Sequence, residues 1–237
     1  MTLCVYALTA GRSARLPIRG AAGERLRLVR EGPIAAVVGE LPRMPRPTPD
    51  NLRRYDLVIR RLAERFPSIL PVRFGASFDD PAELAFVLRS RNASLRRELS
   101  KVRNRVQMTL RVIERGGSAS PPEVESGGPA SPLHRPALNV EGRSGPGVTG
   151  SEYLRRRAEA RAREREIAGF DPMRDAVRRW VREERVEKRA NIATVYHLVP
   201  QASADSYRAA AERAAAAAGL QVVITGPWPP YAFAAVW

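Results

Sequence analysis

The 237-residue sequence contains one cysteine and two histidines, and this scarcity excludes several kinds of chemistry. Cys4 has no second cysteine with which to form an internal disulfide. Together with His134 and His197 it offers at most three nitrogen or sulfur ligands, one fewer than a structural zinc site of that type needs. Cys4 stands in an alternating apolar run, which is typical of a small buried side chain and not of a nucleophile. We therefore expect neither a metal nor a cofactor.

Long apolar runs are also absent from the sequence. No stretch approaches the ~20 apolar residues that a membrane-spanning helix needs. The N-terminus carries its apolar run before its charges, which is the reverse of a secretory signal. The sequence therefore predicts a cytoplasmic protein that has no membrane partner.

Lysine is rare as well, since 38 of the 40 basic residues are arginine and the net charge is +15. Residues 1–115 hold most of this excess, at +12. Such a charge raises an alternative function, that of an arginine-rich protein which binds nucleic acid. The arginines fall mainly on the polar faces of predicted helices, however. We interpret most of them as solvated surface charges and do not expect a nucleic-acid partner.

The common catalytic signatures are missing too. No GxxxxGK[ST] occurs, no GxGxxG follows a predicted strand, and HExxH, CxxC and GxSxG are absent. The acidic pairs Asp79-Asp80 and Glu183-Glu184 have no companion cluster, and Asp80 is better placed to cap a helix. The sequence predicts a protein that is not an enzyme.

Residues 1–115 alternate short apolar runs with amphipathic helices. One helix is predicted from Thr48 to Phe66, and a second from Asp80 to Leu99 with a break near Asn92. The order of strand, hairpin, helix, strand, helix, strand predicts an α+β sandwich of the ferredoxin-like type, with helices on one face of an antiparallel sheet. The predicted strands cover residues 2–8, 26–29, 34–38, 69–74 and 102–113.

The remaining sequence divides into two parts. In residues 116–150, Gly, Pro and Ser fill 19 of the 35 positions, which predicts a flexible linker or loop. Residues 151–237 predict a second ferredoxin-like unit, because long charged helices of coiled-coil character over Tyr153–Arg189 are followed by alternating strands and a helix. The later elements are a strand at 191–200, a helix from Ser203 to Ala218, a strand at 220–224 and a closing strand at 231–237.

The last fourteen residues, ITGPWPPYAFAAVW, are uncharged and hold a concentration of aromatic residues and prolines. The prolines restrict the backbone to extended conformations, so Trp228 is held on a stiff elbow. Rigid aromatic side chains recur at interface hot spots, which favours a docking role for Trp228. The segment can equally be a structural clasp in which Phe233 packs onto covering helices. Both roles remain open, and they can coexist.

Two motifs resemble signatures of one family. LPVRFGASF at residues 70–78 is similar to the LPVRFG-type segment of the gas vesicle protein F/L family, and GPWPPYAF at 226–233 is similar to that family's C-terminal segment. TLCVYAL, IAAVVGELP, NLRRYDLVI and NIATVYHLVP follow the same pattern at the expected places. The resemblance covers most of the chain apart from residues 116–150.

The resemblance implies two linked α+β units and a location at the gas vesicle within the cytoplasm. It also implies a non-enzymatic accessory or minor structural protein that binds the small hydrophobic shell protein, and further accessory proteins, during vesicle assembly. The candidate partner-binding residues are Trp228, Tyr231, Arg73 and Phe74. Arg73 has two alternative roles: it can bind an anion, or it can pair with an acid on a covering helix.

Overall fold

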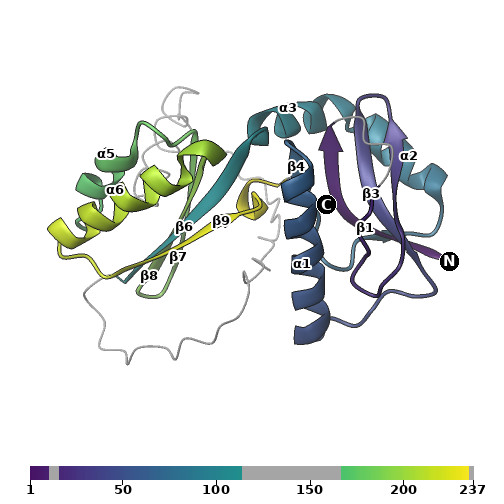
Figure 1. The fold of residues 1–237 in the computed structure, drawn as a ribbon, viewed down its shortest axis with the longest axis horizontal. Helices are drawn as coiled ribbons and strands as arrows, with labels where there is room; N and C mark the ends of the chain where they lie inside the picture. The colour runs from purple at the N-terminus through teal and green to yellow at the C-terminus, as the bar shows by residue number, and fades with distance from the viewer. Residues whose placement is uncertain (11–15, 114–166, 235–237) are drawn as a thin grey trace, which may run out of the picture.

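Two antiparallel sheets organise the chain in the computed structural model, which describes residues 1–10, 16–113 and 167–234 (Figure 1). The first sheet follows the order β2-β3-β1-β4, with β5 also pairing with β1. The predicted β2–β3 hairpin is confirmed, and it turns at Gly32, whose φ of 58° favours glycine. The strands are β1 (Thr2–Ala10), β2 (Leu26–Glu31), β3 (Ile34–Leu41), β4 (Ile69–Pro71) and β5 (Ser77–Phe78).

Three helices cover this sheet: α1 (Pro49–Arg65), α2 (Pro81–Ser90) and α3 (Asn92–Val102). The sequence allows Thr48 or Asp50 as the cap of α1, and the structure uses Thr48, whose hydroxyl accepts from Asn51 N at 3.3 Å. The predicted cap Asp80 is present, since its carboxylate accepts from Ala82 N at 2.8 Å. The predicted break near Asn92 is also present, since α2 ends at Ser90 and α3 begins two residues later.

The helices lie on both faces of the first sheet, which corrects the prediction of helices on one face. Strand β1 explains the difference, because its alternate residues enter two different cores. Tyr6 packs on the α1 face, whereas Leu3 and Val5 pack on the face covered by α2 and α3. A strand that is apolar on both sides needs cover on both sides.

The second sheet has the order β7-β8-β6-β9. Its helices, α5 (Asp171–Val177) and α6 (Ala204–Ala217), pack on one face against apolar side chains of β6 and β8. A 3₁₀ turn, η1, covers Gln201–Ser203. The strands are β6 (Arg105–Ile113), β7 (Glu183–Arg189), β8 (Ile192–Pro200) and β9 (Val222–Trp228).

Strand β6 therefore belongs to the second sheet, although the sequence predicts it as the last strand of the first unit. It pairs with β8 along its whole length and with β9 on its other side. The chain passes from one half to the other at Asn104, where φ is 54°. Asn104 N donates to the Pro67 carbonyl at 2.6 Å, and its own carbonyl accepts from Gln201 N at 3.0 Å.

Within the described residues, the prediction of charged helices up to Arg189 is confirmed for Asp171–Val177 and wrong beyond Val177. Helix α5 ends at Val177, and residues 183–189 form the edge strand β7. Charged side chains spaced three or four apart are compatible with a helix, but charges are also usual on exposed edge strands. The first half of the predicted helices, up to residue 166, and the segment 116–150 lie outside the described residues. Within those that are described, no helix has the length and apolar character that a membrane crossing requires.

Candidate functional site

The GPWPPYAF segment begins within β9 and continues past its end. Strand β9 runs as far as Trp228, which pairs with Gln107 of β6. Gly226 has a φ of 118°, and a Cβ atom there would lie 2.7 Å from the Gln107 carbonyl oxygen, so only glycine fits. A 3₁₀ turn, η2 (Tyr231–Phe233), then replaces the predicted closing strand over the described part of that strand. Residues 235–237 lie outside the described residues.

The ring of Trp228 is half-buried at the junction between the two halves. The Arg60 guanidinium carbon of α1 lies 4.2 Å from the centroid of the ring. The indole Nε1 donates to the Thr225 hydroxyl at 3.2 Å. One side of the ring is therefore occupied by a cation–π contact from the other half of the molecule.

Tyr231 meets the same helix. Its hydroxyl donates to the Asp56 carboxylate, which also accepts from the Arg60 guanidinium at 2.6 Å. Burial raises the pKa of Tyr231, and the hydrogen bond to Asp56 raises that pKa further. Arg60 and Asp56 thus connect Trp228 and Tyr231 into one contact network on α1.

Phe233 is buried, with 2% of its surface exposed. It belongs to the core that α2 and α3 form with the first sheet, and so does Leu198 of the second sheet. Side chains of the second half also bind the backbone of the preceding residue, Ala232. Ala232 N donates to the Gln107 side-chain oxygen at 2.7 Å, and the Ala232 carbonyl accepts from Arg185 at 2.6 Å.

Arg73 and Phe74 follow β4, which is shorter than predicted and ends at Pro71. The chain leaves the extended conformation at Gly75, where φ is 97°. Phe74 packs edge-on against Tyr55, with the ring centroids 5.3 Å apart. Arg73 is half-buried beside it, and its carbonyl accepts from Ala76 N at 3.2 Å.

The structure brings Tyr231 and Phe74 to the same side of the first sheet, because both pack against the core beneath α1. Trp228 reaches that helix through Arg60. Sequence reasoning missed Asp56, Arg60, Gln107 and Arg185. The spacing of Asp56 and Arg60 by four residues signals an ion pair on a helix, but nothing local indicates that the pair faces another part of the chain.

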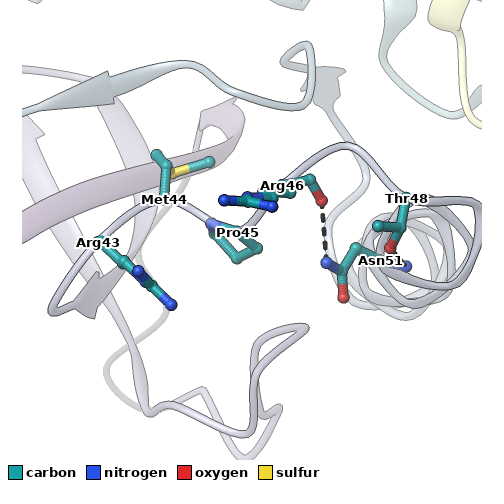
Figure 2. Close-up of a pocket in the computed structure, with 6 residues that line it drawn as sticks. All are labelled: Arg43, Met44, Pro45, Arg46, Thr48 and Asn51. Carbon is teal, nitrogen blue, oxygen red and sulfur yellow. Dashed lines mark hydrogen bonds between the residues drawn. The ribbon is translucent and has the colours of Figure 1, made fainter.

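A shallow hollow lies at the start of α1 (Figure 2). The Asn51 side chain donates to the Arg46 carbonyl at 2.9 Å across one side of it. No acid, histidine or cysteine lines the hollow, so it offers no acid–base pair or nucleophile. Its lining residues are Arg43, Met44, Pro45, Arg46, Thr48 and Asn51.

Two further titratable groups, His197 and Cys4, are packed into the cores. His197 is fully buried, with Nδ1 2.5 Å from the Tyr207 hydroxyl and Nε2 2.9 Å from the Glu184 carboxylate. Burial alone would raise the pKa of Glu184, but hydrogen bonds from His197 and Arg174 outweigh it and lower the pKa to about 2. His197 is therefore a packed residue of the second half.

Cys4 is buried as well, and burial raises the pKa of its thiol to about 12. A thiol that stays protonated is a poor nucleophile. Across the described residues, no group of three or more His, Cys, Asp or Glu side chains is placed to hold a metal ion.

Together these features define an α+β protein with two antiparallel sheets, joined by an aromatic terminal segment. Residues 3–235 match the family described as gas vesicle synthesis protein GvpL/GvpF. The chain belongs to this family, as the sequence motifs suggest. Family membership supports a role in gas vesicle assembly.

Solved structures show the same fold. The gas vesicle protein GvpF from Anabaena sp. PCC7120 matches with a TM-score of 0.69 and 13% identity, over 100% of this chain and 99% of that one. GvpF from Microcystis aeruginosa matches with a TM-score of 0.70 and 14% identity, over 99% of each chain. No curated protein sequence matches this chain.

Proposed function

We propose that this protein is a non-enzymatic accessory factor of gas vesicle assembly, which binds the small hydrophobic shell protein in the cytoplasm and covers or nucleates its apolar surface. A shell protein that faces gas must expose a large apolar area, which would aggregate in water if nothing covered it. A helper for such a protein needs apolar contact surface and no catalytic group. The observation that carries the proposal is the family match over residues 3–235.

Apolar contact surface is present on both halves. Leu52 of α1 is 43% exposed. Trp228 and Tyr231 add a half-buried aromatic surface beside the same helix. Other exposed large apolar side chains are Met1, Leu57, Phe86 and Val223.

We also infer where the two units divide. The described elements from β6 to β9 follow the order strand, helix, strand, strand, helix, strand, which supports a ferredoxin-like second unit. With β6 included in that unit, the division falls at Asn104, earlier than residue 115. The first unit then consists of the first sheet with α1, α2 and α3.

The test is capture of the purified shell protein by the immobilised full-length protein. An aromatic interface hot spot is worth about 2 kcal/mol or more, so Trp228→Ala should weaken capture by ~30-fold. Trp180→Ala is the matched control, because Trp180 is also half-buried and also stacks with an arginine, Arg179, at 3.9 Å. Equal capture by the two variants would remove Trp228 from the interface, and no capture by the wild type would refute shell-protein binding.

The nucleic-acid alternative has less structural support. Several arginines of the first half are neutralised by acids, among them Arg27 with Glu40 at 2.8 Å and Arg89 with Glu31 at 2.9 Å. Salt titration separates the two functions, since phosphate contacts weaken steeply with salt whereas apolar docking does not.

A further inference from the structure

Residues Pro229–Ala234, called the strap below, join the two halves without taking part in either sheet. Pairing between β9 and β6 ends at Trp228. The backbone bonds within the strap are local, from Tyr231 N to the Pro229 carbonyl at 2.7 Å and from Phe233 N to the Pro230 carbonyl at 3.1 Å. Among the described contacts, side chains alone hold the strap to the rest of the protein. The strap can therefore leave its place without breaking a sheet.

The strap covers the edge of the first sheet at β4, beside which it lies (Figure 1). Tyr231 packs on the α1 side of this sheet, whereas Phe233 enters the core on the α2–α3 side. Tyr231 and Phe233 thus lie on opposite faces of the first sheet, on either side of its three-residue edge strand β4. Covering an edge strand with a loop is a common protection against pairing with other chains.

The groups that hold the strap recognise a short and general sequence pattern. The Asp56 carboxylate accepts from a hydroxyl, and a buried apolar site takes the aromatic ring two residues later. Between them, Gln107 and Arg185 bind the N–H and the carbonyl of one residue, Ala232. Bonds to the backbone do not depend on the side chain of that residue. The pattern is tyrosine, any small residue, then phenylalanine or a ring of similar size.

We propose that the junction beside β4 is a peptide-binding site, that the strap is its intramolecular occupant, and that an uncharged partner segment of the Tyr-X-Phe type takes the same place when the strap is released. The identity of the partner, a protein of the vesicle, rests on the proposed function. The existence of the peptide-binding site does not rest on the proposed function. The strap inhibits the site because a tethered segment competes at a high effective concentration.

The first test uses a labelled synthetic peptide with the sequence of residues 228–234, WPPYAFA, and fluorescence anisotropy. The full-length Phe233→Ala protein keeps Asp56, Gln107 and Arg185 but leaves the aromatic site empty. We expect it to bind the peptide at least tenfold more tightly than the wild type does. A peptide with alanine in place of phenylalanine is the control, and it should bind neither protein.

Equal binding to the two proteins, or no binding to a Phe233→Ala protein whose circular dichroism is native, would overturn the proposal.

Native-state hydrogen exchange on the wild type tests the release of the strap independently of any variant. The amides of Ala232 and Ala234 should exchange through a local opening with little dependence on denaturant, at least 100-fold faster than matched amides of β1 and β6. Exchange of these amides only together with the sheets would also overturn the proposal. Neither experiment involves the shell protein, so a failure here leaves the capture experiment with Trp228→Ala unaffected.

Discussion

The two halves of the molecule differ in how their sheets are covered. The first sheet lies between α1 on one face and α2 with α3 on the other, so β1 is buried on both sides. Among the described residues, the second sheet has helices, α5 and α6, on one face, and its other face carries Gln107, Thr109 and Arg111 of β6. The difference shows that the apolar pattern of a single central strand decides how many layers form around it.

The same difference explains where the strap lies. The strap crosses the face of the second sheet opposite α5 and α6, where Gln107 and Arg185 hold it, and reaches the edge of the first sheet. A face covered by helices would leave no room for this crossing. The face of the second sheet opposite α5 and α6 therefore supplies the surface through which the two halves meet.

The largest expected effect concerns β1, which helices cover on both faces. Leu8 is fully buried in this strand, so Leu8→Ala should lower the free energy of unfolding by about 2–5 kcal/mol through lost burial and a residual cavity. Arg111→Ala, at an exposed side chain on the other face of β6 from Met108 and Leu110, should change it by less than ~0.5 kcal/mol. Urea denaturation measures both. Similar losses for the two variants would contradict the distinction between a doubly covered and a singly covered sheet.

A second prediction concerns the turn that leads into the strap. Gly226→Ala should cost about 1–3 kcal/mol, because the added methyl would meet the Gln107 carbonyl and the backbone has positive φ. Gly219→Ala is the control, since Gly219 has a φ of 61° but open space around its Cα, and it should cost ~1 kcal/mol. Thermal unfolding measures the loss of stability in both variants. A smaller loss for Gly226→Ala than for Gly219→Ala would show that the contact between the added methyl and β6 is relieved at little cost.

The third prediction uses the half-buried ion pair of the second half, Glu184 with Arg174 at 3.1 Å. The pKa of Glu184 is about 2 in the folded protein, below its ordinary value of 4.5, so the folded state favours the charged form. Its contribution to stability is therefore complete above about pH 4.5 and is lost as the pH falls towards 2. Glu184→Gln should flatten the pH dependence of the unfolding free energy in this window. An unchanged slope would contradict a role for this carboxylate in acid sensitivity.

The smallest effect is expected at the matching pair in the first half. Arg89 bonds Glu31 at 2.9 Å, and this bond lowers the pKa of Glu31, but the arginine lies largely in solvent. Exposed ion pairs contribute little because water and salt screen them. Arg89→Ala should leave the urea midpoint and its pH dependence almost unchanged. A change in the pH dependence as large as that of Glu184→Gln would show that the difference in burial does not make the two ion pairs differ in their effect on stability.

Local patterns allowed most of the first half to be predicted. The caps at Thr48 and Asp80, the β2–β3 hairpin and the break near Asn92 depend on residues close in sequence, and all are present. Residues 183–189 were harder, because EERVEKR fits a charged helix as well as an edge strand. Pairing with β8 decided between the two, and that pairing is a tertiary contact.

The candidate site was predictable only in part. The aromatic and proline content of the terminal segment identifies Trp228 and Tyr231 from the sequence. Their partners could not be found in this way, because Tyr231 meets Asp56 across 175 positions and Ala232 meets Gln107 across 125. The sequence also placed residues 231–234 in a strand, whereas the structure has a 3₁₀ turn there.

The sequence by itself determined the α+β class, the family, and the shortage of groups for metal or nucleophilic chemistry, because each of these is written in residue types and short spacings. Tertiary structure alone decided that β6 joins the second sheet and that the terminal aromatic residues bridge the two halves. Strand partners and contacts between units depend on which surfaces remain uncovered once the local elements have formed, and no short stretch of sequence carries that information.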